Sequence, residues 1–151
     1  MKTTNAAGPA IVHRILLVDD NRNGLLARKS VLEEHGYEVH AFSLPHEALE
    51  QCQQQSFDLV VTDYRMPRMT GSQLIVEIRA LHPNMPVVLV SGVVDVLGLD
   101  EKSTGANIVI SKSSTEIPHL VRAVKRLLPA QSQKKPARSQ PSAGSSRKKT
   151  G

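Results

Sequence analysis

The stretch DLVVTDYRMP, residues 58–67, places a carboxylate at the exit of an apolar run. Leu59, Val60 and Val61 predict a strand that is buried on both faces, as in a parallel sheet. Asp63 follows after one threonine, and Pro67 ends any continuation of the strand because proline cannot donate to a sheet ladder. A buried strand that delivers an ionisable group to its end indicates a site there.

Similar apolar runs recur along the chain and define the fold class. Strands are predicted at residues 15–18, 57–61, 87–90 and 107–110, with a weaker strand at 38–42. Strands that alternate with helical patterns predict an α/β fold with a mainly parallel sheet. Right-handed crossovers bring the carboxyl ends of such strands to one edge, where open α/β sheets bind their ligands.

The helical stretches differ in the strength of their pattern. The first begins after Asn23, the second has Ser43 as a plausible N-cap, and the last ends at Pro129. The stretch 93–106 has the weakest helical pattern, because Gly98 interrupts it and polar residues crowd its end.

Composition sets the broad class of the protein. With 151 residues, 40% hydrophobic and 3% aromatic, the chain fits one domain with an aliphatic core plus an appendage. Its single cysteine, Cys52, cannot form an internal disulfide and is expected in the core of the second helix. No apolar run is long enough to span a bilayer or to act as a signal peptide. We therefore expect a cytoplasmic protein.

The positive charge of the chain belongs to its end. Residues 130–151 hold six of the 19 Lys and Arg residues and none of the 14 Asp and Glu residues, so residues 1–129 carry a net charge of −1. This Ser-, Pro- and Lys-rich tail has too few apolar residues to offset the entropy of ordering, and we expect it to be disordered. Residues 1–12 are expected to be flexible as well.

Polar groups end four of the predicted strands. Asp19 and Asp20 follow the first, Asp63 the third, Ser91 the fourth and Lys112 the fifth. Taken singly, each is an ordinary turn, cap or edge residue. Together they would crowd carboxylates that repel by about 4 kcal/mol per pair at 4 Å, so compensating cations are needed. Lys112 is one, and an all-oxygen ligand set favours Mg²⁺ as another.

A metal, a carboxylate, an ammonium and a hydroxyl around one point are the groups of a phosphoryl-transfer site, where a carboxylate can be the covalent nucleophile. At these residues the sequence resembles the receiver domain of bacterial two-component response regulators. Four pieces carry the resemblance, namely ILLVDDN (15–21), DLVVTDYRMPRMTG (58–71), PVVLVSG (86–92) and GANIVISK (105–112). They fit, in order and spacing, over about residues 13–128.

The resemblance implies a flavodoxin-like, doubly wound sheet of five parallel strands in the order 2-1-3-4-5, with helices on both faces. It implies a receiver domain at residues 13–129. It also implies a Mg²⁺ site in which Asp20 and Asp63 bind directly, Asp19 binds mostly through water, and the backbone carbonyl of Arg65 is a further ligand.

The resemblance further assigns the chemistry. It implies that Asp63 is the phosphoacceptor, that Lys112 pairs with Asp63 and then with the phosphoryl group, and that Ser91 donates its hydroxyl to a phosphoryl oxygen. The donor would be a phosphohistidine on a histidine kinase or phosphotransfer protein. With no output domain after residue 128, we expect a stand-alone receiver that is not an enzyme in its own right and signals by docking on an unidentified downstream protein.

Three features depart from the family pattern, all on the face that usually transmits the signal. Val109 stands where an aromatic residue is usual, Ser113 stands where proline is usual, and the fourth helix is weak. A degenerate receiver that acts as a phosphorylation-independent scaffold is therefore an alternative interpretation.

Two other functions compete with the receiver. A haloacid-dehalogenase-type phosphatase would need an acid where Arg65 stands and room for a cap domain, so we disfavour it. A nucleic-acid or acidic-surface tether could use the basic tail. Because no aromatic residue is interleaved for stacking, we favour a solvated tail over nucleic-acid binding.

Overall fold

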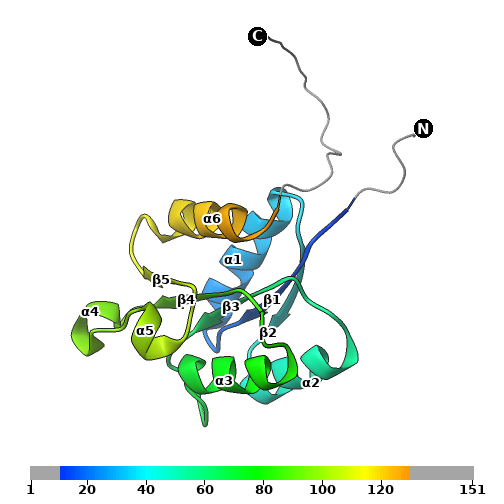
Figure 1. The fold of residues 1–151 in the computed structure, drawn as a ribbon. Helices are drawn as coiled ribbons and strands as arrows, with labels where there is room; N and C mark the ends of the chain where they lie inside the picture. The colour runs from blue at the N-terminus through cyan, green and yellow to red at the C-terminus, as the bar shows by residue number, and fades with distance from the viewer. Residues whose placement is uncertain (1–10, 130–151) are drawn as a thin grey trace, which may run out of the picture. The chain divides into compact units, whose positions relative to one another are not determined.

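Five parallel strands form one sheet in the order β2-β1-β3-β4-β5, which confirms the predicted flavodoxin-like arrangement (Figure 1). The computed structural model describes residues 11–129, so the expectations for residues 1–10 and for the tail at 130–151 lie outside it. The strands are β1 (Arg14–Val18), β2 (Glu38–Phe42), β3 (Leu59–Asp63), β4 (Val87–Ser91) and β5 (Ile108–Ser111).

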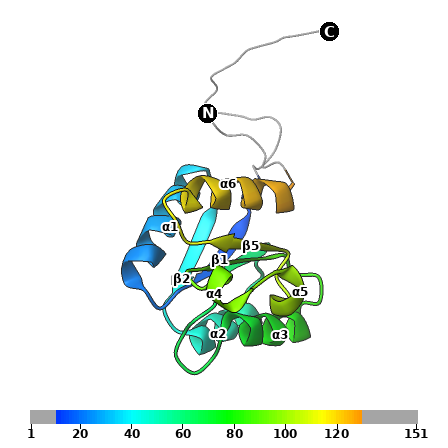
Figure 2. The same ribbon diagram turned by 90° about the vertical axis from the view of Figure 1, so that its left-hand side faces the viewer.

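Helices cover both faces of this sheet. They are α1 (Arg22–Glu34), α2 (Pro45–Gln54), α3 (Gly71–Leu81), α4 (Val94–Leu97), α5 (Glu101–Thr104) and α6 (Glu116–Leu127). Figures 1 and 2 show α1 and α6 on one face, α2 and α3 on the other, and the two short helices α4 and α5 near the β5 edge.

The core is divided between the two faces by the period-two alternation of the strands. In β1, Ile15 and Leu17 join the cluster under α1 and α6, whereas Leu16 and Val18 join the cluster against α2 and α3. All five residues of β3 are buried, as are all five of β4, which is why these strands are continuous apolar runs in the sequence.

The register of the central strands positions the polar residues at their ends. β1 and β3 are neighbours, and their pairing ends with Val18 beside Thr62. The next residues along the two strands, Asp19 and Asp63, therefore emerge side by side. By alternation they continue the rows of Leu17 and Val61, on the face that α1 and α6 cover.

The predicted start of the first helix was wrong. α1 begins at Arg22 rather than after Asn23, and the Asn21 side chain caps it by accepting from the Gly24 N–H at 2.9 Å.

Two further local predictions need correction. β3 runs to Asp63 and begins at Leu59, two residues later than predicted, so the carboxylate belongs to the strand itself. Ser43 is not the N-cap of α2, because Leu44 holds that position without a side-chain hydrogen bond and Pro45 begins the helix. Proline suits the first helical position because its missing N–H would be unpaired there in any case.

The weak stretch 93–106 forms two separate turns of helix. α4 ends at Gly98, which adopts the left-handed conformation (φ 62°), and α5 begins after Asp100, whose side chain accepts from the Ser103 N–H. Gly98 thus interrupts the helix as expected. Among residues 11–129, none of the helices has the length and hydropathy required to span a bilayer.

Candidate functional site

Three carboxylates converge where β1 and β3 end. Asp19, Asp20 and Asp63 each place one carboxylate oxygen within 4.8 Å of the others. Asp19 and Asp63 are buried, whereas Asp20 is exposed. The first two positions follow from the strand register, and the third follows because Asp20 is the next residue after Asp19 in the β1–α1 turn.

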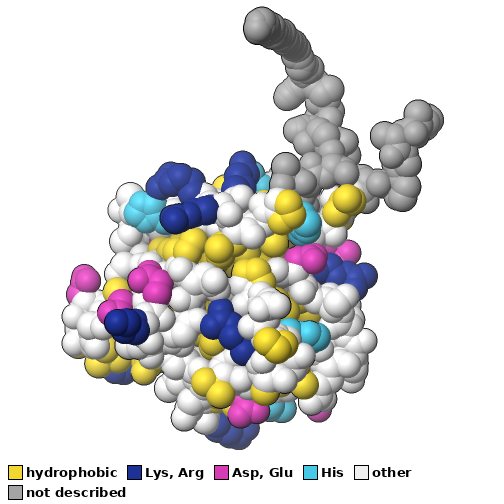
Figure 3. Space-filling view, viewed as in Figure 1, with side chains coloured by type: hydrophobic (Ala, Val, Ile, Leu, Met, Phe, Trp, Pro, Cys, Tyr) yellow, Lys and Arg dark blue, Asp and Glu magenta, His cyan; other side chains and the backbone are white. Residues whose placement is uncertain are grey.

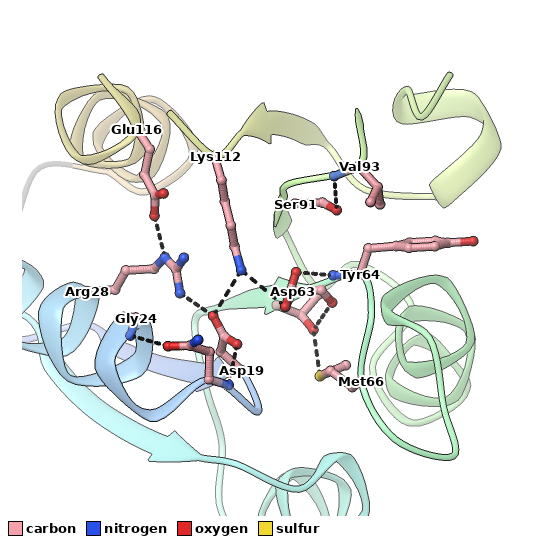
Figure 4. Close-up of polar contacts among 12 residues, drawn as sticks. Asp19, Gly24, Arg28, Asp63, Tyr64, Met66, Ser91, Val93, Lys112 and Glu116 are labelled. Carbon is pink, nitrogen blue, oxygen red and sulfur yellow. Dashed lines mark hydrogen bonds and ion pairs between the residues drawn. The ribbon is translucent and has the colours of Figure 1, made fainter. Parts of the chain in front are cut away.

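Asp63 is held by donors on both of its oxygens. The backbone N–H of Tyr64 donates to Oδ1 at 2.8 Å, and Lys112 Nζ donates to Oδ2 at 3.2 Å (Figure 4). Burial raises the pKa of Asp63 above its ordinary value, and the charge of Asp19 raises it further, while Lys112 acts in the opposite direction. The carboxylate of Asp63 is therefore less stable in the folded protein than in water, and charge compensation at this point is incomplete.

Lys112 reaches the carboxylates from the end of β5. Its backbone N–H donates to the Ser91 carbonyl at 2.9 Å, which fixes the end of β5 against β4. From there its side chain extends between two acids, with Nζ 3.2 Å from Asp63 Oδ2 and 3.5 Å from Asp19 Oδ2 (Figure 4). One ammonium is thus shared by two buried carboxylates.

Arg28 is a second cation at this site, and it was not among the residues predicted from the sequence. It lies on α1, is 4% exposed, donates from Nη1 to Asp19 Oδ2, and donates from Nε to Glu116 Oε2 at 2.6 Å. A signal was available in the sequence. Arg28 falls in the helical row of Leu25 and Leu32, which are core residues, so an arginine there must have buried acidic partners.

The loop after Asp63 is packed directly against α3 through a glycine. The Gly71 N–H donates to the Tyr64 carbonyl at 2.7 Å, and a Cβ on Gly71 would lie 2.3 Å from the Asp63 carbonyl oxygen. Only glycine allows this approach. The α3 N-terminus and its Thr70 capping box therefore buttress the backbone that carries Asp63.

Ser91 and Arg65 are not engaged with Asp63 in the described part of the chain. Ser91 is buried, and its Oγ accepts from the Val93 N–H at 3.1 Å, which ties it to the β4–α4 loop. Its hydroxyl hydrogen remains available to a further acceptor. Arg65 is exposed in the β3–α3 loop, two residues beyond Asp63.

Two of the three departures from the family pattern, Val109 and Ser113, lie next to this site in the sequence and have structural counterparts. Val109 is half-buried in β5, where its N–H donates to Glu101 Oε2 at 3.3 Å and its side chain packs on the α2–α3 side of the core. Ser113, in place of proline, has a hydroxyl 3.1 Å from Thr115 Oγ1 that also accepts from the Thr115 N–H at 3.2 Å. A turn stabilised by the Ser113 hydroxyl therefore connects Lys112 to α6.

The residues at this site suit a small hard cation. All three acidic groups offer oxygen, which Mg²⁺ prefers, and the exposed Asp20 leaves one side of the cluster open to water. Asp19 already accepts the Asn21 N–H on Oδ1 and two cationic groups on Oδ2, so it suits a water-mediated role better than a direct one. The sheet edge, the acid cluster and the lysine thus define an α/β domain with an oxygen-rich acidic site at the carboxyl ends of its strands.

Comparison with known proteins agrees with that class. The profile of the response regulator receiver domain family matches residues 15–125, and the chain belongs to this family. Among curated proteins, the transcriptional regulatory protein ZraR of Escherichia coli K12 is 39% identical over 77 residues, which is 51% of this chain. The match covers 18% of ZraR, so the chain corresponds to a small part of that protein.

Solved structures give the same fold. The response regulator TrrA of Thermotoga maritima, solved in complex with Mg²⁺-BeF, is 32% identical with a TM-score of 0.70, covering 78% of this chain and 100% of that one. TrrA in complex with the histidine kinase ThkA matches with 31% identity and a TM-score of 0.69, over 78% of this chain and 100% of that one.

Proposed function

We propose that the chain is a phosphoacceptor in a two-component phosphorelay and that Asp63 receives the phosphoryl group. The observation that carries this proposal is the convergence of Asp19, Asp20, Asp63 and Lys112 at one end of a parallel sheet. The family supports it, as does the solution of TrrA with Mg²⁺-BeF.

In this proposal each residue has a distinct task. An Asp63 carboxylate oxygen attacks phosphorus in line, the P–N bond to the donor histidine breaks, and the imidazole leaves with the bonding electron pair. Lys112 moves its charge from Asp63 onto the equatorial phosphoryl oxygens. Ser91 exchanges its contact with the β4–α4 loop for one with a phosphoryl oxygen, which shifts the loop.

The magnesium site is assigned to Asp19, Asp20, Asp63 and the Arg65 backbone carbonyl, with Asp19 acting through water. Bound Mg²⁺ supplies charge neutralisation of the phosphoryl oxygens and orientation for in-line attack. The same acids otherwise repel an incoming anionic phosphoryl group, so phosphorylation is expected to require the metal.

The partner that supplies the phosphoryl group is proposed to be a histidine kinase or a histidine phosphotransfer protein. The complex of ThkA with TrrA supports this class of donor, since TrrA shares the fold. The phosphorylated chain would then bind a downstream protein.

We propose that residues 13–129 form the receiver in the cytoplasm, with no catalysis beyond making and losing its own phosphate.

The test is phosphorylation by a small donor. The full chain is incubated with acetyl phosphate and Mg²⁺ and its intact mass is measured. We expect one phosphate adduct, which is lost in Asp63→Asn and after chelation of Mg²⁺. Asp58→Asn is the matched control, because Asp58 is at the start of the same strand region and should leave the adduct unchanged. Absence of an adduct with acetyl phosphate and with a phosphohistidine donor would favour the scaffold alternative.

Arg65 is proposed to set the lifetime of the phosphate rather than its formation. It is exposed and lies two residues beyond Asp63, a position from which it can screen the phosphoryl group from water. Arg65→Ala should still form the adduct but change the rate at which it is lost, measured by mass over time after donor removal. An unchanged lifetime would exclude this role.

A further inference from the structure

The most unusual polar group outside the proposed reaction is the buried guanidinium of Arg28. It and the Lys112 ammonium contact the same atom, Asp19 Oδ2, while Asp19 Oδ1 accepts the Asn21 N–H at 2.8 Å. The Asp19 carboxylate thus pairs with two cations and accepts a hydrogen bond from one backbone amide. Figure 4 shows Arg28 reaching Asp19 from the α1 side, opposite the direction from which Asp63 approaches Lys112.

The arrangement around Arg28 holds the guanidinium at both ends. Glu116, in the first turn of α6, accepts from Arg28 Nε at 2.6 Å, and the two side chains are 5% and 13% exposed. Gly24 provides the space on α1, since a Cβ there would lie 3.0 Å from Arg28 Nη1 and 3.3 Å from Asp19 Oδ2. Side chains of α6 and α1 are therefore linked to the acidic cluster through one buried cation.

Arg28 and Glu116 carry charges that act on metal binding in opposite directions. Arg28 places a permanent positive charge against Asp19, where it competes with any dication for the same negative charge. Glu116 offsets that charge from the other side of the guanidinium. Because these groups are buried, salt screens their interaction less than it screens surface charges.

We propose that Arg28 is a positioning residue that holds Asp19 away from direct ligation and lowers Mg²⁺ affinity, and that Glu116 counteracts it. This rests on the proposed function, because it concerns the same magnesium site. The Glu116–Arg28–Asp19 chain makes the affinity of the site depend on the packing of α6 against α1. Mg²⁺ binding in turn weakens the hold of Asp19 on Arg28, since linkage between the two is reciprocal.

The test measures Mg²⁺ binding to the unphosphorylated full chain by isothermal titration calorimetry. Arg28→Met fills the same volume without charge and is expected to tighten Mg²⁺ binding by about tenfold, because a competing unit charge is removed. Glu116→Gln is expected to weaken it about threefold, because the guanidinium loses its charged acceptor on α6 and then pairs more strongly with Asp19. In the double variant the Glu116→Gln effect should fall below about twofold.

The two variants are expected to change Mg²⁺ affinity in opposite directions, and this distinguishes the proposal from a purely structural role. If Arg28 only supported the pocket, both variants would loosen Asp19 and both would weaken binding, which would overturn the proposal. Equal Glu116→Gln effects with and without Arg28 would overturn the part assigned to Glu116. Arg122→Met and Glu77→Gln remove the same charges from exposed sites on α6 and α3, and should change the affinity less than about twofold at physiological salt.

The outcomes separate this inference from the proposed function. Lack of Mg²⁺ binding in the unsubstituted chain would contradict the magnesium site itself. Normal binding that neither variant alters would contradict only the role of Arg28 and Glu116. If Arg28→Met does not fold, as judged by circular dichroism, the conservative Glu116→Gln still decides, since an unchanged or tightened affinity would overturn the inference.

Discussion

The acidic pocket and the α4–α5 segment both follow strand ends of the same sheet, yet they are held in very different ways. Asp19 and Asp63 extend from β1 and β3, whose apolar residues are at most 1% exposed. α4 and α5 have four residues each, and Val96 of α4 is 81% exposed. On the face in Figure 3, acidic side chains gather over α4 and α5, while Lys and Arg gather over α6.

The two regions differ in packing because only the pocket has to hold buried like charges close together. Like charges in a buried pocket repel, so the backbone that carries them has to be fixed by well-packed strands and close contacts such as that of Gly71. Short helices with few buried residues open locally at low cost. The difference in packing therefore predicts that the pocket opens less readily than the α4–α5 segment.

The largest effect is expected where the pocket is most tightly packed. Gly71→Ala would force a Cβ to within 2.3 Å of the Asp63 carbonyl oxygen, a backbone atom that cannot move aside freely. We expect a loss of about 2–3 kcal/mol in the free energy of unfolding, measured in urea.

Gly92→Ala is the matched control for Gly71→Ala. A Cβ at Gly92 meets only Lys112 Cδ, at 4.0 Å, so a change within about 0.5 kcal/mol is expected. Similar losses at the two glycines would show that the pocket backbone is no more constrained than its surroundings.

The second prediction concerns the charge of Asp63. Because its pKa is raised in the folded protein, the folded state binds this proton more tightly, and the ionised form opposes folding at neutral pH. Asp63→Asn should therefore stabilise the metal-free protein by about 1–2 kcal/mol at pH 7. This difference in the free energy of unfolding should disappear as the pH falls through the raised pKa of Asp63 and below its ordinary value of 3.8.

Urea unfolding with a chelator, compared at several pH values, measures this difference. Asp95→Asn on exposed α4 is the control and should be nearly neutral throughout. A destabilised Asp63→Asn at pH 7 would mean that the contacts with Lys112 and Tyr64 outweigh burial and the repulsion from Asp19.

The third prediction tests the α4–α5 segment. Gly98 has φ 62°, and no atom lies within 4 Å of the position that a Cβ would take there, so Gly98→Ala adds backbone strain alone. We expect a cost of about 1 kcal/mol or less, seen as faster amide exchange in α4 with β3 unchanged. Gly98→Asn should cost less, because asparagine tolerates the left-handed conformation. Faster exchange in β3 would show that the two regions open together.

The smallest effect concerns Cys52 on α2, which belongs to neither of the two regions. Burial raises the pKa of Cys52 to about 11, so its thiol is protonated at neutral pH and packed in the core. Alkylation of the Cys52 thiol at pH 7.5 should be much slower in the folded protein than in urea. This test needs no substitution, so the stability of the protein is unchanged. Equal rates would mean that the core around α2 opens readily.

The fold was predictable because it depends on patterns that are local in the sequence. Short apolar runs rich in valine, such as 87–90, favour buried strands of a parallel sheet, and polar residues at their exits then meet at one edge. The errors were local as well. The start of β3 and the cap of α2 depend on hydrogen bonds that composition does not specify, so Ser43 was assigned a role that Leu44 and Pro45 hold.

The sequence alone predicted that three carboxylates and a lysine would lie at the carboxyl edge of the sheet, because parallel strands joined by right-handed crossovers all end at that edge. Only the tertiary structure decided how their charge is balanced. Arg28 contacts Asp19, and Glu116, which is 88 residues from Arg28, reaches that arginine only when α1 and α6 pack on the same face. Ion pairing depends on distances of a few ångströms between side chains, and no periodicity along the chain encodes such distances.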